Sequence, residues 1–417
     1  MQKAKGGAMA RKPNATYPDS VQPGIPVLGP LPEGWVREPL GKRLYEIKRP
    51  VKMQDDCIYN LVTVKRSRGG AGKRESLQGK EIKVKSQFEV HSGDFLISKR
   101  QIVHGACALV PEELHGAIVS NEYSILGSKK DIDLTFLRYL SETKYFQETC
   151  FHSSTGVHVE KMVFKLDRWF KWEFNFPPKK EQQKIVCILT TWDTAITFTQ
   201  KLIENSKQQK KSLMQQLLTG RRRLSEFCSD WKTCSLSQLA HVEKGKPLNG
   251  DQVVPGQFPV IAGGQTSPYS HNTFTHKNAI TISASGAYAG FVAYHKKKFW
   301  GSDCSIVQAK SGVDIQFLFF SLLTNQKSIY SLQRGGAQPH VYPKDIARLT
   351  IPTPPLDEQK AIAKILTAAD ALIAQYEAKL AHLQQQKKAL MQQLLTGKIR
   401  VTPDTPDTSG NACETPA

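Results

Sequence analysis

The octapeptide LMQQLLTG stands at residues 213–220 and is repeated without change at residues 390–397. The offset between the copies is 390 − 213 = 177 residues, and it continues upstream without a gap. Pro177-Pro178 falls on Pro354-Pro355, and Glu181-Gln182 falls on Glu358-Gln359. Because self-similarity at a fixed offset marks a repeated structural unit, we infer that the chain carries two copies of one segment.

Both copies place apolar side chains in alternating steps of three and four residues, the heptad pattern of a coiled coil. A Pro-Pro pair precedes each copy and a glycine, Gly220 or Gly397, closes it, as expected at the two ends of a long helix. We call the recurring positions the seam. Its apolar and aromatic members are Ile185, Leu189, Trp192, Ile196, Ile203, Leu213 and Leu217, and then Ile362, Leu366, Ile373, Tyr376, Leu380, Leu383, Leu390 and Leu394.

The simplest partner for one helix is its own copy, and a two-fold relation between duplicated helices makes the pair antiparallel. About 39 residues per helix correspond to roughly 58 Å at 1.5 Å per residue. Lys210 and Lys387 interrupt the seam, where a lysine either fixes the register or extends to water. Two amphipathic helices packed on separate cores are the alternative to a coiled coil.

A longer stretch precedes each helix, and the two stretches resemble each other weakly. Trp35 and Trp231 open them, and residues 121–125 align with residues 302–306. Alternating apolar runs predict strands within residues 94–100, 279–285 and 289–295, and helical runs follow at residues 133–146 and 316–332. The predicted order is a flexible tail (1–30), an α+β domain with a curved sheet (31–176), a helix (177–220), a second such domain (226–353), a helix (354–398) and a flexible tail (401–417).

The chain carries a formal net charge of +20, which favours a polyanionic partner. Nucleic acid is the first candidate and an anionic membrane surface the second, while a soluble basic protein without such a partner is the plain alternative. No apolar stretch is long enough to cross a bilayer, and no signal peptide is recognisable. The eight cysteines include no CxxC pair, which argues against a zinc site and favours a reducing cytoplasm.

Together these features resemble the specificity subunit of Type I restriction–modification systems over roughly residues 31–400. The residues that carry the resemblance are PPKKEQQKI (177–185), PPLDEQKAI (354–362), both LMQQLLTG ends, the tryptophans that open the domains, and GGAQPHV (335–341). The first domain departs from the pattern, because it lacks a clear GAQP-like segment and carries the basic stretch KRSRGGAGKRES (65–76).

The resemblance implies two target-recognition domains joined by two long helices in an antiparallel coiled coil. It implies a non-catalytic subunit that reads a bipartite DNA target with an unread gap and directs methylation and cleavage by partner subunits. The implied partners are double-stranded DNA, two methyltransferase subunits and motor-nuclease subunits. It also implies that this chain holds no cofactor, and that S-adenosylmethionine, ATP and magnesium belong to the partners.

Three short segments resemble parts of catalytic motifs, but none of them matches a complete motif. Residues 175–178 contain the elements of a methyltransferase NPPY loop in the wrong order. Residues 358–360 fit half of a nuclease site without an upstream acidic partner, and GGAGK (69–73) lacks the first glycine of a P-loop. We therefore assign no catalytic residue and no metal ligand.

Contacts to DNA divide into phosphate contacts, which supply affinity, and base contacts, which supply sequence specificity. The predicted phosphate-binding residues are Lys65, Arg66, Arg68, Lys73 and Arg74 in the first domain and Lys296, Lys297 and Lys298 in the second. The predicted base-reading residues are Lys99, Arg100, Gln101, His104 and His158 in the first domain and Ser283, Ser285, Tyr288, Gln338 and His340 in the second. For each, a purely structural or solvated side chain is the alternative.

Other classes of protein fit parts of the pattern. A stand-alone DNA-binding regulator or architectural protein would bind DNA tightly without a methyltransferase. An enzyme with an unrecognised site would show activity in isolation. A coiled-coil interaction protein that does not bind DNA would lack the steep salt dependence of phosphate-neutralising binders.

Overall fold

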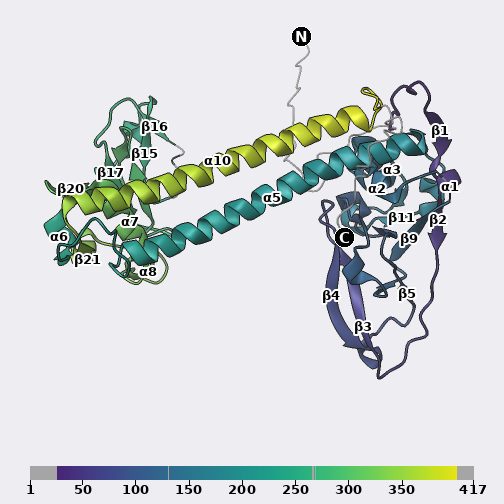
Figure 1. Ribbon diagram of the computed structural model, residues 1–417, viewed down its shortest axis with the longest axis horizontal. Coiled ribbons are helices and arrows are strands. Elements are labelled where there is room, and N and C mark those ends of the chain that lie inside the picture. Colours follow the sequence, from purple (N-terminus) through teal and green to yellow (C-terminus); the bar gives the residue numbers. More distant parts are fainter. Residues whose placement is uncertain (1–25, 130, 265–266, 268, 402–417) are drawn as a thin grey trace, which may run out of the picture. The chain divides into compact units, whose positions relative to one another are not determined.

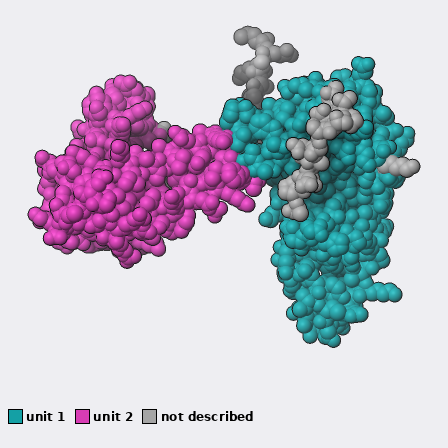
Figure 2. Space-filling model, viewed as in Figure 1, with its two compact units in different colours: residues 1–196, 382–417 teal, residues 197–381 magenta. Residues whose placement is uncertain are grey.

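The structure of the protein is a computed structural model that describes residues 26–129, 131–264, 267 and 269–401 (Figure 1). It divides into two compact units (Figure 2). Unit 1 comprises residues 1–196 and 382–417, and unit 2 comprises residues 197–381. Each unit thus combines one α+β domain with parts of both long helices. Residues 1–25 and 402–417 of the two predicted tails lie outside the described residues.

The two repeated segments form the longest helices of the described chain, α5 (Lys179–Leu217) and α10 (Leu356–Leu394), of 39 residues each. Gly220 and Gly397 follow them with positive φ angles of 70° and 69°, the left-handed geometry that ends a helix. Every apolar seam position is buried or half-buried in both helices. Between the seam positions, residues 384–386 of α10 and 204–205 of α5 are exposed, as expected when one stripe of each helix is covered.

Two ion pairs connect the helices in an antiparallel sense. In unit 1, Lys387 Nζ of α10 donates to Asp193 Oδ1 of α5 at 2.7 Å. In unit 2, Lys210 Nζ of α5 donates to Asp370 Oδ1 of α10 at 2.5 Å. The 177-residue offset maps Asp193 onto Asp370 and Lys210 onto Lys387, so the pairs are equivalent. The predicted antiparallel pairing is therefore confirmed.

The seam lysines are held inside the helix pair instead of extending to water. Their side chains are 11% exposed at Lys387 and 16% exposed at Lys210. Each ammonium also lies over an aromatic ring of its own unit, Lys387 at 5.4 Å from the centroid of Tyr139 and Lys210 at 5.2 Å from that of Phe320. A charge pair at a fixed seam position opposes any slip of register, so these lysines serve the first of the two roles predicted for them.

The domain of unit 1 contains two four-stranded sheets, with strand orders β2-β9-β6-β7 and β4-β3-β8-β5. Two short pairs, β1-β12 and β10-β11, complete it. The strands are β1 (Val36–Pro39), β2 (Leu44–Ile47), β3 (Ile58–Val64), β4 (Ala71–Gln78), β5 (Gln87–Glu89), β6 (Phe95–Ser98), β7 (Cys107–Leu109), β8 (Ile118–Ser120), β9 (Tyr123–Ser128), β10 (Ser154–Thr155), β11 (Val163–Phe164) and β12 (Glu173–Phe176).

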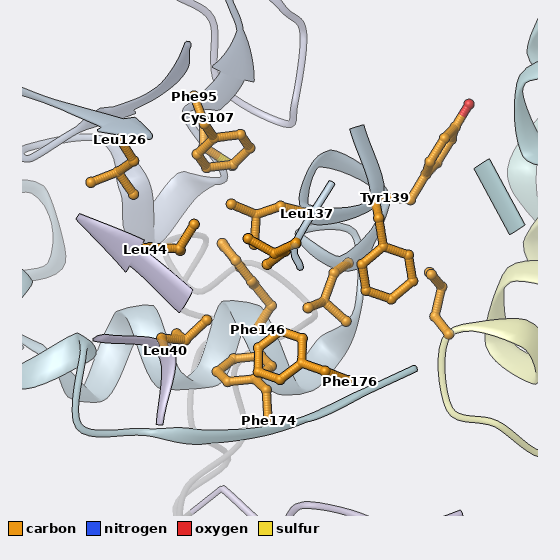
Figure 3. Packing of buried hydrophobic residues seen from close by; sticks show 14 of the residues in the cluster. Leu40, Leu44, Phe95, Cys107, Leu126, Leu137, Tyr139, Phe146, Phe174 and Phe176 are labelled. Carbon is orange, nitrogen blue, oxygen red and sulfur yellow. The ribbon is translucent and has the colours of Figure 1, made fainter. Parts of the chain in front are cut away.

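The helices of this domain lie on the sheet β2-β9-β6-β7 and bury the largest apolar cluster of the unit (Figure 3). Phe95 and Leu126 from the sheet meet Leu137, Tyr139 and Phe146 from the helices in this core. Seam residues of both long helices belong to the same cluster, so the helix ends are part of the domain core. The helices are α1 (Leu40–Arg43), α2 (Leu134–Leu140), α3 (Lys144–His152) and α4 (Leu166–Trp169), with 3-10 turns at Gly79–Glu81, Ile102–His104, Glu112–Leu114 and Val159–Lys161.

The domain of unit 2 repeats the central sheet of unit 1, with the order β14-β20-β17-β18, and adds a three-stranded sheet, β16-β15-β19, and the pair β13-β21. The strands are β13 (Lys232–Ser235), β14 (Ala240–Lys244), β15 (Phe258–Ile261), β16 (Ser270–His271), β17 (Ala279–Ser283), β18 (Val292–His295), β19 (Trp300–Gly301), β20 (Cys304–Ala309) and β21 (Thr350–Thr353). The helices are α6 (Leu236–Leu239), α7 (Ile315–Thr324), α8 (Gln326–Tyr330) and α9 (Pro343–Ile346), with a 3-10 turn at Gly250–Gln252.

The predicted domain helices exist, but each is divided in two. The sequence predicts one helix over residues 133–146, whereas α2 ends at Leu140 and α3 begins at Lys144. The hydroxyl of Thr143 accepts a hydrogen bond from Phe146 N, and this cap starts the second helix. In unit 2 the corresponding division falls between α7 and α8, at Asn325.

Substituting Asp193 by Asn is expected to lower the free energy of unfolding at pH 7 by about 2 kcal/mol, because the hydrogen bonds to a charged acceptor are lost. Burial favours a higher pKa for Asp193, but hydrogen bonds from Lys387, Tyr139 and Arg138 outweigh it and lower the pKa. A carboxylate with a lowered pKa in the folded state stabilises the fold above its unfolded pKa, and this contribution disappears as the pH falls through the folded pKa.

Urea unfolding at pH 7 and in steps below pH 4 measures this effect. The wild-type chain should lose stability in acid more steeply than the Asp193→Asn variant. Asp56, which is exposed, provides the matched control, since Asp56→Asn removes the same charge and should leave both values unchanged. Parallel pH profiles for the wild-type chain and Asp193→Asn would contradict the assignment.

Candidate nucleic-acid interface

The central sheet of each unit has its own junction, where three segments meet at the end of the third strand in the sheet order. The backbone pattern of the junction is the same in both units. In unit 1, Lys99 N donates to Glu122 O at 2.8 Å, and Phe164 N donates to Lys99 O at 2.8 Å. In unit 2, Ala284 N donates to Asp303 O at 3.2 Å, and Val341 N donates to Ala284 O at 2.9 Å. The same backbone frame therefore carries different side chains in the two units.

In unit 1 the junction is joined by the tip of the hairpin β3-β4. Ser67 N and Arg68 N donate to the carbonyls of His104 and Gly105, and this brings the basic stretch against the loop after β6. Arg66 then donates through Nε to Gln101 Oε1 at 2.6 Å and through Nη2 to Glu160 Oε2 at 2.7 Å. Arg66, Gln101 and the loop 99–105 thus form one polar surface.

His104 lies at the edge of this surface. Burial and the neighbouring Arg66 cation lower the pKa of His104, against the opposing effect of Glu160, whose Oε1 lies 3.1 Å from its Nε2. The hydrogen bond from Arg66 lowers the pKa of Glu160 itself. At neutral pH the histidine is therefore predominantly neutral and offers one donor and one acceptor.

The remaining base-reading candidates of unit 1 differ in whether their side chains bind other residues of the protein. Lys99 donates through Nζ to Asn121 O at 2.8 Å, while Arg100 pairs with the carboxylate of Glu122. His158 is exposed in the loop before β11, next to Val157, which is 92% exposed. The structure therefore gathers Lys99, Arg100, Gln101 and His104 in one loop and leaves His158 on a neighbouring one.

In unit 2 the loop after β17 contacts the segment 334–341. Ser285 forms an isolated β-bridge with His340, and Gly286 N donates to Pro339 O at 3.0 Å. Tyr288 and Gln338 are exposed on these two loops. Ser283 is 3% exposed, and its hydroxyl donates to Gly263 O at 2.9 Å, so it supports the loop from beneath. Ser285, Tyr288, Gln338 and His340 thus lie on two loops that contact each other.

The phosphate candidates do not form one set. Lys65, Arg66, Lys73 and Arg74 are exposed on the hairpin β3-β4, although Arg74 pairs with Glu75. Arg68 is half-buried and donates to Ser141 O at 2.8 Å and to Gln147 Oε1 at 3.0 Å, which are structural contacts. The three lysines of unit 2 are exposed after β18, at the opposite end of that strand from the junction: Lys296, Lys297 and Lys298.

Sequence reasoning missed the acidic partners at the junction. Glu122 and Asp303 hold equivalent positions, and the alignment of residues 121–125 with residues 302–306 places one on the other. An acidic residue at matching positions of both domains, in a chain with a formal net charge of +20, was the sequence feature that could have indicated these partners. Glu160, which binds Arg66, has no such counterpart in the sequence.

The described residues contain no group of three or more His, Cys, Asp or Glu side chains arranged to hold a metal ion. Among the helices of the described chain, none has the length and apolar character that a membrane-spanning helix requires.

A family profile described as "Type I restriction modification DNA specificity domain" matches residues 48–207 and 228–385, which together exceed half of the chain. The chain belongs to this family. Its two matches coincide with the internal repeat, because each contains one domain and most of the following helix. The family role is recognition of DNA, and the chain is accordingly a non-catalytic specificity subunit.

Individual relatives agree with the family assignment. The chain is 25% identical to the Type I restriction enzyme MjaVIII specificity subunit of Methanocaldococcus jannaschii, over 89% of this chain and 94% of the relative. It is 28% identical to the putative MjaX specificity subunit of the same organism, over 54% of this chain and 59% of the relative.

Solved structures share the fold. The crystal structure of a Type I restriction–modification S subunit from M. genitalium matches with a TM-score of 0.58 at 16% identity, covering 86% of this chain and 96% of that one. The crystal structure of the HsdS subunit from Thermoanaerobacter tengcongensis matches with a TM-score of 0.50 at 15% identity, covering 89% of this chain and all of that one.

Arg68 and Lys65 are expected to respond oppositely to substitution by Ala, although both belong to the basic stretch of the specificity subunit. Arg68→Ala should lower the free energy of unfolding by about 1–3 kcal/mol, because it leaves buried acceptors unpaired. Lys65→Ala should leave the stability within about 0.5 kcal/mol and reduce the slope of log affinity for DNA against log salt by about one. Urea unfolding and a salt titration of DNA binding measure the two effects. A stable Arg68→Ala variant with a reduced salt slope would return Arg68 to the phosphate-binding set.

Proposed function

We propose that each unit reads one part of a bipartite DNA target, and that the bases between the two parts are not read. The observation that supports this is the shared junction, where one backbone frame presents Lys99, Arg100 and Gln101 in unit 1 but Ala284, Ser285 and Gly286 in unit 2. Base edges are distinguished by side-chain donors and acceptors, so different side chains on one frame read different sequences.

The base-reading set proposed from the sequence is retained for both units, with Ser283 in a supporting role. The proposed phosphate contacts come from Lys65, Arg66, Lys73 and Arg74 in unit 1 and from Lys296, Lys297 and Lys298 in unit 2. Because the last three lie at the far end of β18 from the junction, we assign them to backbone contacts outside the bases that unit 2 reads.

The catalytic steps belong to partner subunits in this proposal. Two methyltransferase subunits would bind S-adenosylmethionine and dock on the outer surfaces of α5 and α10, whose repeated sequence offers two equivalent docking faces. Motor-nuclease subunits would supply ATP- and magnesium-dependent cleavage. The compartment is the cytoplasm, in keeping with the free thiols of Cys57, Cys107, Cys150, Cys187, Cys228, Cys234 and Cys304. A stand-alone regulator is not favoured by the family assignment.

Genome-wide methylation mapping tests the proposal directly. Cells that carry the gene and its methyltransferase partner should show methylation at one bipartite motif, and deletion of the gene should remove the motif entirely. Replacing residues 31–176 by the corresponding domain of a relative is expected to change one half of the motif only, since the second domain is untouched. A change in both halves, or methylation that persists without the gene, would contradict the proposal.

Lengthening both helices by one heptad is expected to widen the unread gap by about three base pairs, since seven residues add roughly 10.5 Å and base pairs are spaced by about 3.4 Å. Duplicating residues 197–203 inserts one heptad of α5 between Asp193 and Lys210. Duplicating residues 377–383 inserts one heptad of α10 between Asp370 and Lys387, so both Lys–Asp pairs retain their partners.

Methylation mapping then compares the gap and the two half-sites with those of the wild-type chain. The control duplicates residues 197–203 alone, which leaves the helices unequal and should abolish methylation. Changed half-sites with an unchanged gap in the doubly lengthened variant would refute the role of the helices as spacers.

A further inference from the structure

The acidic residues at the junction need an explanation in a protein that binds DNA. Glu122 and Asp303 occupy equivalent positions, because the backbone carbonyl of each accepts a hydrogen bond from the residue after the third strand. A carboxylate near phosphates repels them and weakens binding unless it is paired or contacts a base. Its presence in both units, whose neighbouring side chains have diverged, therefore points to a function at this position.

In unit 1 the carboxylate fixes one edge of an arginine. Arg100 donates to Glu122 through Nε at 2.7 Å and through Nη2 at 3.3 Å. A guanidinium carries five N–H donors, so the edge formed by Nη1 and the second Nη2 hydrogen stays available. The two side chains are 55% and 46% exposed, which leaves that edge accessible to a DNA base.

The free edge has the geometry that guanine requires. Guanine presents O6 and N7 side by side in the major groove, and arginine binds both acceptors with a pair of parallel N–H groups. Holding the guanidinium by Glu122 before DNA arrives reduces the conformational entropy that binding would otherwise cost. The pair also has no net charge, so it adds specificity without adding non-specific attraction to phosphate.

In unit 2 the same position carries an acceptor without an arginine. Ser285, which follows the strand as Arg100 does, donates its hydroxyl to Asp303 Oδ2. No other side chain in the described part of the chain donates a hydrogen bond to Asp303. Arg334, the arginine of the adjoining segment 334–341, pairs with Asp345 at 3.1 Å. Among the described residues, the second oxygen of Asp303 therefore has no hydrogen-bond donor.

Gly263 packs closely against Asp303 and Ser285. A Cβ atom at Gly263 would lie 2.9 Å from Ser285 O and 3.1 Å from Asp303 Oδ2, so only glycine permits this close packing. A carboxylate acceptor selects a base with an amino donor. Cytosine fits best, because its major-groove edge offers the N4 amino group and no adjacent acceptor that a carboxylate would leave unsatisfied.

We propose that Arg100, positioned by Glu122, reads a guanine in one half-site, and that Asp303, positioned by Ser285, reads a cytosine in the other. Arg100 and Asp303 are the specificity-determining residues, whereas Glu122 and Ser285 act through them; this assigns Ser285, a base-reading candidate from the sequence, a positioning role. This inference rests on the proposed function, because it assigns one base in each half of the bipartite target.

The test uses the full chain in complex with its methyltransferase and measures binding to the wild-type target and to targets changed at single positions. Arg100→Ala should reduce discrimination at one guanine of the first half-site by about tenfold to hundredfold and leave the second half-site unchanged. Asp303→Asn should reduce discrimination at one cytosine of the second half-site only. Glu122→Gln should relax the same base pair as Arg100→Ala, while its affinity for non-specific DNA rises because a negative charge is lost.

Glu38→Gln is the matched control. Glu38 pairs with Arg43 Nε at 2.8 Å in the same unit, and the substitution removes the same charge away from the junction. It should leave base discrimination unchanged at every position. Glu122→Asp, which keeps the carboxylate, should restore part of the discrimination that Glu122→Gln loses.

The outcomes separate the two proposals. If the wild-type complex shows no sequence preference, the proposed function fails. If it binds a bipartite target but the position affected by Arg100→Ala is not a guanine, or Glu122→Gln relaxes a different position, the assignment of the first unit is wrong. If Asp303→Asn leaves every cytosine preference intact, the assignment of the second unit is wrong.

Discussion

One buried carboxylate holds each unit together, Glu181 in unit 1 and Glu358 in unit 2. Glu181 and Glu358 stand in the first turns of α5 and α10 and are 3% and 0% exposed. Burying a carboxylate costs several kcal/mol unless it is paired and fully hydrogen-bonded. Each accepts an indole N–H, from Trp35 at 3.2 Å and from Trp231 at 3.1 Å. An arginine completes each set with two hydrogen bonds, Arg400 on Glu181 and Arg223 on Glu358.

The arginines make this interaction more than a local cap. Arg223 follows α5 yet binds the start of α10, and Arg400 follows α10 yet binds the start of α5. The next residue in each helix extends the connection, because Gln182 and Gln359 accept from the backbone N–H groups of Asp133 and Asp314, which cap α2 and α7. Each domain is therefore tied to the beginning of one long helix and to the end of the other. Neither helix can shift without breaking a buried charge pair.

Repetition made the long helices predictable, whereas contacts between residues far apart in the sequence were not. The offset of 177 residues, the seam and the closing glycines predict the long helices and their antiparallel pairing, because all of these are local or periodic signals. The partners of Glu181 and Glu358 were not predictable, since Arg400 lies 219 residues from Glu181 along the chain. The candidate site stays a prediction: most of its residues lie on neighbouring loops, whereas the burial of Ser283 and the structural contacts of Arg68 depend on packing that no periodicity encodes.

The long helices and their buried contacts contribute most to the stability of the fold, whereas the side chains at the two junctions contribute little. The long helices and the Glu–Trp–Arg sets are buried, so a substitution there leaves a cavity or an unpaired buried charge and destabilises the fold. The junction side chains are exposed or half-exposed, and surface ion pairs contribute little to stability. Under the proposed base assignment, replacing an arginine–glutamate pair by a serine–aspartate pair would change which base is favoured without straining the backbone that presents the side chains. Two units built on one frame could then differ in the proposed specificity at low structural cost, since residues 99–101 and 284–286 differ while the backbone pattern is the same.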